Sequence, residues 1–235
     1  MHIMDCHGVI ALVQGGVLHY LLRKRALGAN QAERLNAIDG ERKAWYMAHP
    51  RMLRIPRIKA GNCISNGWAE LHGPAFKAAN TRGAVRFFKL LADKYCTDES
   101  IVDMNIKSLL TSLEKFNELL YTEPMFMSEA KVIELQKHTL DFGRHYQILR
   151  DEARKHKVLA WNHTPKVHRM QHFPMLAEII NPRHVSVYME ESMIGTTLKV
   201  YRRGMNGRYQ ASIQRTVLVK RMLGLFLRFE DSCGP

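Results

Sequence analysis

The feature that most constrains this chain is a regular spacing of apolar residues in its middle third. Between residues 104 and 149 the predicted core positions recur every three or four residues, in two runs separated by the short segment YTEPMFM. The two runs are Ile106, Leu109, Leu110, Leu113, Phe116 and Leu120, then Val132, Leu135, Thr139, Phe142, Tyr146 and Leu149. Such spacing places one buried stripe along each of two helices. Because the connection is short, we predict that the two helices pack antiparallel.

Helices are also predicted before this pair. Residues 8–27 carry apolar side chains near helical spacing, and Gly28 follows them, as is common after the last turn of a helix. Residues 30–49 suggest another helix, and Thr81 is placed to cap one over residues 82–95. We therefore predict a mainly α fold, a helical bundle with little β structure.

Composition divides the chain into three predicted regions. N-terminal helices and a basic loop occupy residues 1–67, the helical bundle occupies 68–156, and a histidine-rich segment with basic C-terminal helices occupies 157–235. Residues 50–67 hold two prolines and two glycines and no acidic residue, which is typical of a surface loop or a hinge.

The sequence shows neither a membrane span nor a secretion signal. No stretch approaches the roughly 18 to 20 apolar residues that a transmembrane helix needs. The apolar opening lacks the positive start and the small-residue cleavage site of a signal peptide. The four cysteines form no CxxC pair, which favours reduced thiols. We predict an intracellular protein that is not secreted and has no membrane partner.

Positive charge is the clearest indication of a partner. The chain has 35 Lys and Arg against 22 Asp and Glu, a formal charge of +13, which favours polyanions. No acidic residue occurs between Ser192 and Phe229. We predict that this block binds nucleic acid through Lys199, Arg202, Arg203, Arg208, Arg215, Lys220 and Arg221. The alternative is that these side chains pair with acidic residues of the bundle.

A cluster of histidines follows the predicted bundle, in the segment WNHTPKVHRMQHFP. If residues 166–172 are helical, His168 and His172 lie one turn apart on the same face, the geometry with which two imidazoles bind one zinc ion. Structural zinc takes four ligands, so His163 or a cysteine, Cys63 or Cys96, would complete the site. The alternative is a set of polar or phosphate-facing histidines.

Three carboxylates are candidate ligands for Mg²⁺. Asp5 precedes the first predicted helix, and Glu190 and Glu191 stand between the β-like segment VSVYM and the next helix. Carboxylates at such junctions hold magnesium in two-metal nucleic-acid enzymes. Asp5 could equally be a helix N-cap, and the two glutamates could match the dipole of a first helical turn. The chain has no GxSxG, Walker-type or GxGxxG motif.

Taken in order, these motifs carry a family resemblance. The segment MHIMDCHGVIALVQGGVLHYLL, the long helical region, PKVHRMQH and an acidic residue before basic helices resemble the C-terminal part of CACTA-like cut-and-paste DNA transposases. In that family a ribonuclease-H-like core supplies two Asp and one Glu, and a helical insertion separates the second Asp from the Glu. The resemblance implies that Asp5 is the second acidic residue, that His168 and His172 are the paired histidines, and that Glu190 or Glu191 is the last acidic residue.

The resemblance also implies a function. The strand that carries the first Asp would lie before Met1, so the chain would be a truncated or degenerate piece that binds nucleic acid and is catalytically incomplete alone. A longer form would be a metal-dependent DNA transposase or nuclease. The implied partner is DNA rather than RNA, with a homo-oligomer allowed, and the implied location is the nucleus. The residues leave open a second hypothesis, a non-catalytic, all-helical interaction or nucleic-acid-binding protein.

Overall fold

Helices account for most of the structure. The computed structural model describes residues 8–73, 76, 78–97 and 100–185. All of them belong to one of the two units into which the chain divides, Met1–Ser186. Among the described residues the only strands are β1 (Ile64–Ser65) and β2 (Trp68–Ala69), an antiparallel pair. The mainly α prediction is confirmed, and none of the described helices is long and apolar enough to cross a membrane.

The helical elements differ greatly in length. The longer helices are α1 (Val9–Leu21), α2 (Gln31–Ala48), α4 (Val85–Tyr95), α5 (Ile101–Thr122) and α6 (Glu129–Lys155). Shorter helical segments fill the connections: η1 (Arg25–Leu27), η2 (Ala60–Asn62), α3 (Ala78–Gly83), α7 (Pro165–Met170), α8 (Phe173–Ala177) and η3 (Pro182–Val185).

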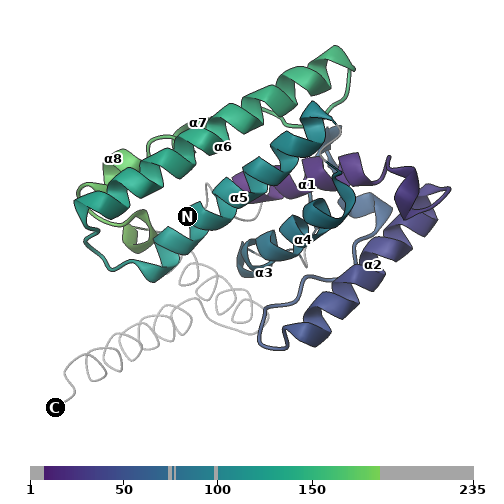
Figure 1. Ribbon diagram of the computed structural model, residues 1–235, viewed down its shortest axis with the longest axis horizontal. Coiled ribbons are helices and arrows are strands. Elements are labelled where there is room, and N and C mark those ends of the chain that lie inside the picture. The colour runs from purple at the N-terminus through teal and green to yellow at the C-terminus, as the bar shows by residue number, and fades with distance from the viewer. Residues whose placement is uncertain (1–7, 74–75, 77, 98–99, 186–235) are drawn as a thin grey trace, which may run out of the picture. The chain divides into compact units, whose positions relative to one another are not determined.

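The helices α5 and α6 form the predicted antiparallel pair and lie side by side along most of their length (Figure 1). Every core position predicted for the two runs is buried. Ser100 caps α5, because its Oγ accepts a hydrogen bond from the Asp103 amide at 3.1 Å. Ser128 holds the predicted N-cap position of α6, although its side chain makes no cap hydrogen bond.

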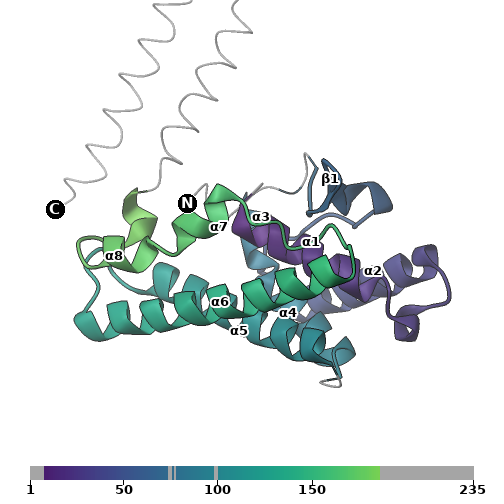
Figure 2. The ribbon, with the colours of Figure 1, turned by 90° about the horizontal axis from the view of Figure 1, so that it is seen from above.

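The helix α1 is the most deeply buried element of the described fold. It contacts α3, α4, α7 and β2, and in Figure 2 it lies beneath the chain that leads from α6 to α7. A Cβ added to Gly15 would stand 2.4 Å from Glu70 Cα, and one added to Gly16 would stand 2.9 Å from the ring of Trp161. The two glycines therefore allow two other segments to pack directly on the backbone of α1.

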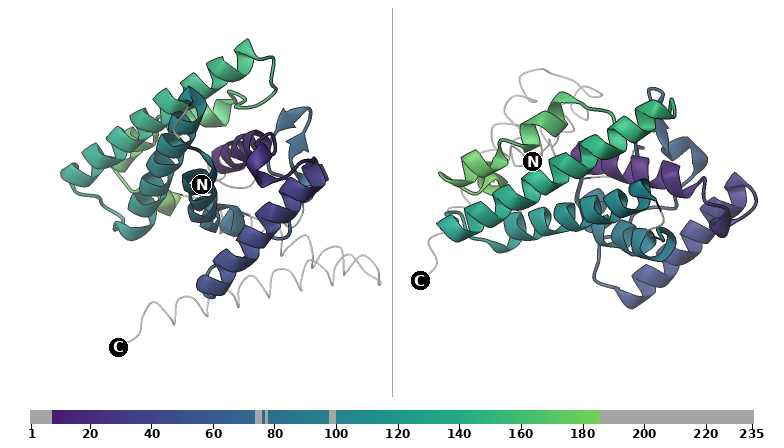
Figure 3. Two further views of the ribbon diagram at one scale, coloured as in Figure 1. Left: turned by 45° about the vertical axis from the view of Figure 1, so that its right-hand side comes forward. Right: turned by 45° about the horizontal axis from the view of Figure 1, so that its top comes forward.

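The helix α2 contacts α4 and η1 and lies away from α6 in both views of Figure 3. Asn30 caps it by accepting a hydrogen bond from the Glu33 amide at 2.9 Å. Within α2 the buried Asp39 pairs with Arg42 at 2.8 Å and with Lys43 at 3.3 Å. The N-cap and these ion pairs stabilise α2, which buries few of its own side chains.

A buried carboxylate joins α1 to α5. Asp103 accepts hydrogen bonds from the Tyr20 hydroxyl at 2.7 Å, the Lys24 ammonium at 2.8 Å and the Thr97 amide at 3.2 Å. Burial alone would raise the pKa of the Asp103 carboxyl, but the hydrogen bonds from Lys24 and Tyr20 outweigh burial, and the pKa is lowered. Asp103 is therefore a charged, structural contact.

The first predicted helix is wrong at its C-terminal end. The prediction covers residues 8–27, whereas α1 ends at Leu21 and Gly28 follows η1 with φ +146°. The guanidinium of Arg34 donates to the carbonyl oxygens of Leu22 at 2.6 Å and Gly28 at 2.8 Å. A side chain from the next helix thus satisfies carbonyls at this break, which apolar spacing does not reveal.

The predicted capping role of Thr81 is also wrong. Thr81 lies inside α3 and is buried, while α4 begins later, at Val85, after Ala84. The carbonyl oxygen of Thr81 accepts a hydrogen bond at 2.7 Å from the side chain of Gln14, which is buried in α1. This contact joins residues far apart in sequence, so the local pattern around Thr81 does not reveal it.

Candidate functional site

Most residues predicted to carry chemistry lie outside the part of the chain that the structure describes. These are the carboxylates Asp5, Glu190 and Glu191 and the basic residues Lys199, Arg202, Arg203, Arg208, Arg215, Lys220 and Arg221. The magnesium site and the basic block therefore stay predictions. The three histidines lie within the described residues.

The structure brings two of these histidines together. Pro165 begins α7, as the sequence indicates, His168 lies in α7, and His172 stands directly before α8. Their Nε2 atoms are 3.3 Å apart, the rings meet edge to face, and both side chains are exposed. Although the helix breaks between them, the two imidazoles are close enough to act on one ligand.

The other ligands considered for zinc do not join this pair. No group of three or more His, Cys, Asp or Glu residues that could hold a metal occurs among the described residues. The Cys63 thiol donates to the Lys59 carbonyl oxygen, and burial raises its pKa to about 11. Burial, and then the nearby Asp103 carboxylate, raise the pKa of Cys96 to about 12. The described residues thus supply two imidazoles, and zinc binding stays a prediction.

The chain leaves α6 through a loop of unusual backbone geometry, residues 157–163. The Lys157 amide donates to the Arg154 carbonyl oxygen at 3.0 Å, and the Val158 amide donates to the Ala153 carbonyl oxygen at 2.8 Å. This pair of hydrogen bonds is the Schellman motif that ends many helices, usually with Gly or Asn at positive φ. Here Lys157 has φ +53°, and Trp161 has φ +58°. Strained backbone of this kind concentrates at functional sites.

Contacts from β2 and from α6 hold the 157–163 loop. The Leu159 carbonyl oxygen accepts a hydrogen bond from the Ala69 amide of β2 at 2.8 Å. The hydroxyl of buried Tyr146, in α6, donates to the Asn162 carbonyl oxygen at 2.8 Å. The ring of Trp161 meets that of Tyr146 edge to face. The loop is therefore a fixed part of the fold.

One side of this loop, with α6 and β2, forms a groove of about 400 Å³. None of the described residues that line it is acidic. We call it the cationic groove, and its polar and aromatic lining is Trp68, Arg150, Arg154, Lys157, Trp161, Asn162 and His163. Trp68 is half-buried, so part of its ring faces the groove, whereas Trp161 is buried in the loop.

Two of the groove's cations have no ion-pair partner among the described residues. Arg154 and Lys157 form no ion pair with any described residue. The nearby carboxylate of Glu152 pairs with Lys155 instead, at 2.5 Å. The pKa of His163 is lowered, first by burial and then by Arg150, His168 and Arg154. A lowered pKa beside cations is the expected response to a positive local field.

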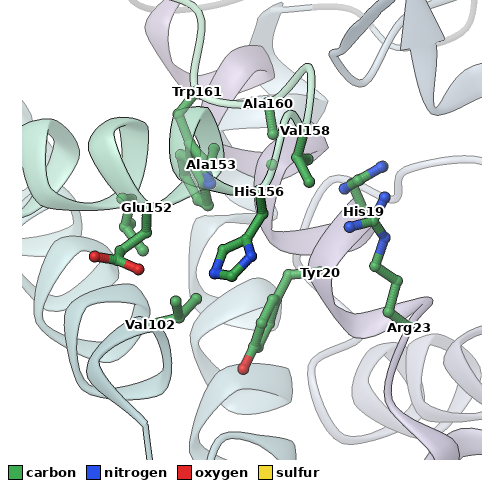
Figure 4. A pocket seen from close by; sticks show the side chains of 12 residues that line it. His19, Tyr20, Arg23, Val102, Glu152, Ala153, His156, Val158, Ala160 and Trp161 are labelled. Atoms are coloured by element: carbon green, nitrogen blue, oxygen red, sulfur yellow. The ribbon is translucent and has the colours of Figure 1, made fainter.

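A second concavity lies on the other side of the same loop, between α1, α5 and α6 (Figure 4). This α1–α6 pocket has a volume of about 150 Å³ and a mostly apolar lining that includes Val102, Leu149 and Ala153. Figure 4 shows the imidazole of His156 projecting into the space between Glu152 and Tyr20. Val158, Ala160 and Trp161 line both the pocket and the cationic groove.

Of the residues that line the cationic groove, only His163 is expected from the sequence to carry chemistry, as a possible zinc ligand. The sequence does contain a sign of the groove's positive charge, because Arg150, Arg154 and Lys157 follow one another at helical spacing near the end of a long predicted helix. What the spacing could not show is that Trp68, some eighty residues earlier, faces the same groove. Comparisons with family models, with curated proteins and with solved structures find no match to this chain.

Proposed function

We propose that this protein binds nucleic acid and that the cationic groove contacts its phosphates. The observation that carries the proposal is a fixed concave surface with three cations, Arg150, Arg154 and Lys157, and no carboxylate among the described residues that line it. Two of these cations form no ion pair among the described residues. Phosphate contacts of this kind supply most of the affinity of sequence-independent binding, because each releases condensed counterions.

The tryptophan at the edge of the groove supports the same proposal. A positively charged groove that tracks a phosphate backbone is commonly combined with aromatic rings on which bases stack. Trp68 is half-buried and shares the groove with Arg150 and Arg154. A small inorganic anion would contact only the cations of the groove, whereas a polynucleotide could also stack a base on the ring of Trp68.

A more specific proposal is that the chain is a transposase-derived, catalytically incomplete piece that binds DNA rather than RNA in the nucleus. Its support is the order of sequence motifs, together with the closeness of His168 and His172, which agrees with the paired histidines of that family. Its carboxylates, Asp5 with Glu190 or Glu191, would hold Mg²⁺ in a longer form, and the histidines would contribute to a zinc site.

The test is salt-dependent binding of the full chain to a labelled oligonucleotide, followed by fluorescence anisotropy. We expect the triple variant Arg150→Gln, Arg154→Gln, Lys157→Gly to bind more weakly. The slope of log affinity against log salt should flatten by about two units, because three phosphate contacts on a single strand are lost. Glycine suits the positive φ of position 157, so this change removes charge without disturbing the backbone.

A matched control removes the same charge elsewhere. Arg25, Arg51 and Lys137 are exposed and lie outside the cationic groove. The triple variant Arg25→Gln, Arg51→Gln, Lys137→Gln should change the slope much less. Equal losses in the two triple variants would show only a general charge effect and would contradict the proposal, as would an unchanged slope in the groove variant.

A further inference from the structure

The α1–α6 pocket and the cationic groove share one wall, and this juxtaposition indicates what kind of nucleic acid fits. Val158, Ala160 and Trp161, all in the 157–163 loop, line both concavities. One side of the wall offers cations, and the other offers a mostly apolar space whose lining also includes Arg23 and Glu152. A ligand that uses both must carry negative charge and an aromatic ring within a few bonds of each other.

The size of the pocket matches one ring. An apolar cavity of roughly 150 Å³ accepts a molecule as large as benzene, and the α1–α6 pocket has about this volume. Its lining comes from three helices, with Val102 in α5, Leu149 and Ala153 in α6, and Gly16 in α1. A single six-membered ring fits such a space, whereas a two-ring purine would have to extend beyond it into the opening of the pocket.

The rim of the pocket offers groups that can bond to the edge of a heterocycle. His19 is half-buried, and burial, with Arg23 nearby, lowers its pKa, so its imidazole is neutral at pH 7 and can both donate and accept a hydrogen bond. His156 is exposed and its ring points into the pocket (Figure 4). Neither ring has a hydrogen-bond partner among the described residues.

We infer that the ligand is a single-stranded nucleic acid, and that the α1–α6 pocket receives one unstacked pyrimidine base while the cationic groove binds the neighbouring phosphates. The inference rests on the proposed function. In a duplex the bases are stacked and paired, so inserting one would first cost its unpairing, whereas a single strand presents its bases freely. Nucleotides join a ring and a phosphate within a few bonds, so one strand can place a base on one side of the shared wall and a phosphate on the other.

The experiment fills the pocket without touching the groove. Val102→Phe, in the first turn of α5, places a ring in the pocket, and Ala153→Leu does the same from α6. Ile101→Phe is the control, because Ile101 is exposed, adjacent in sequence and not part of the pocket lining. Circular dichroism establishes that each variant is folded, and two filling variants are used in case one is not.

Affinities are measured by anisotropy for labelled oligo-dT, oligo-dA and a duplex with the same number of phosphates. The unmutated protein should bind oligo-dT more tightly than oligo-dA. Either filling variant should weaken oligo-dT binding by about tenfold, the effect of losing one buried base. Duplex affinity and the salt slope should not change, and Ile101→Phe should behave like the unmutated protein.

The outcomes separate this inference from the proposed function. If both filling variants are folded and bind oligo-dT normally, while the groove variant binds it weakly, the pocket inference is overturned and nucleic-acid binding stands. Equal weakening of oligo-dT and duplex by the filling variants would also overturn it. If the groove variant changes no affinity at all, the proposed function itself fails.

Discussion

The α5–α6 pair and the 157–163 loop follow one another in the chain, yet different contacts hold them. The pair is stabilised by many buried apolar side chains at helical spacing, so no single atom decides its geometry. The loop depends on a few backbone hydrogen bonds, on two residues at positive φ, and on the ring of Trp161 packed against Gly16. In this loop the side chains of Lys157, Leu159 and His163 face solvent, and the groove and the pocket lie on its two sides.

The largest effect is expected from Gly15→Ala in α1, which tests the packing of the β2 segment on the backbone of α1. The added Cβ would stand within 2.7 Å of three backbone atoms of Ala69 and Glu70, and backbone cannot move aside as a flexible side chain can. We expect a loss of about 4 kcal/mol in the free energy of unfolding, measured by urea denaturation.

The control for this change is Gly40→Ala in α2, where an added Cβ meets nothing within 4 Å. Alanine has the higher helix propensity, so a gain of about 0.5 to 1 kcal/mol is expected. A tolerated Gly15→Ala would mean that β2 does not pack on the α1 backbone as described.

Within the helix pair, Leu113→Ala should cost about 3 kcal/mol, because it removes a fully buried side chain and leaves a cavity. Leu140→Ala is the matched control, since Leu140 is 62% exposed in α6 and its loss should cost less than about 0.5 kcal/mol. Similar values for the two variants in urea denaturation would contradict the assignment of the buried stripe.

Asp103→Asn tests the polar contact between the pair and α1. Losing a charge-assisted contact to Lys24 and Tyr20 should cost about 2 kcal/mol at pH 7. The folded pKa of Asp103 is lowered, so its contribution is complete above the unfolded pKa of about 4 and is lost as pH falls through the folded pKa. The free-energy difference between unmutated protein and variant should therefore shrink below about pH 4, and a difference that is constant from pH 7 to pH 3 would exclude this role.

The smallest expected effect is a gain. Lys157→Gly relieves a positive φ and should add about 0.5 to 1 kcal/mol to the free energy of unfolding. Lys155→Gly, at the last residue of α6, has no positive φ to relieve and should instead lose up to about 1 kcal/mol. Thermal unfolding followed by circular dichroism distinguishes the two, and a loss at both positions would mean that Lys157 is not strained.

Sequence alone predicts the parts of this fold that local periodicity determines. Phe116 and Phe142 are buried as their spacing indicates, and Pro165 begins a helix as its fixed φ allows. The end of α1 and the position of Thr81 are mispredicted because the deciding groups, Arg34 and Gln14, come from other elements.

The candidate site was less predictable for the same reason. The closeness of His168 and His172 follows from a four-residue spacing, so sequence reveals it. The cationic groove needs Trp68 beside Arg154, and the pocket needs Val102 beside Ala153, which are tertiary contacts without a periodic signal. Nor does composition predict that Lys157 would occupy a position where glycine is usual.

The central position of α1 also affects how the protein is made. α1 is almost entirely buried, but Trp161, which covers Gly16, is synthesised 140 residues after Leu21. At about 5 to 20 residues per second, the ribosome exposes this apolar helix for roughly 7 to 28 s before Trp161 can cover it. During that interval the apolar surface of α1 lacks part of its native cover, and transiently exposed apolar surface favours aggregation.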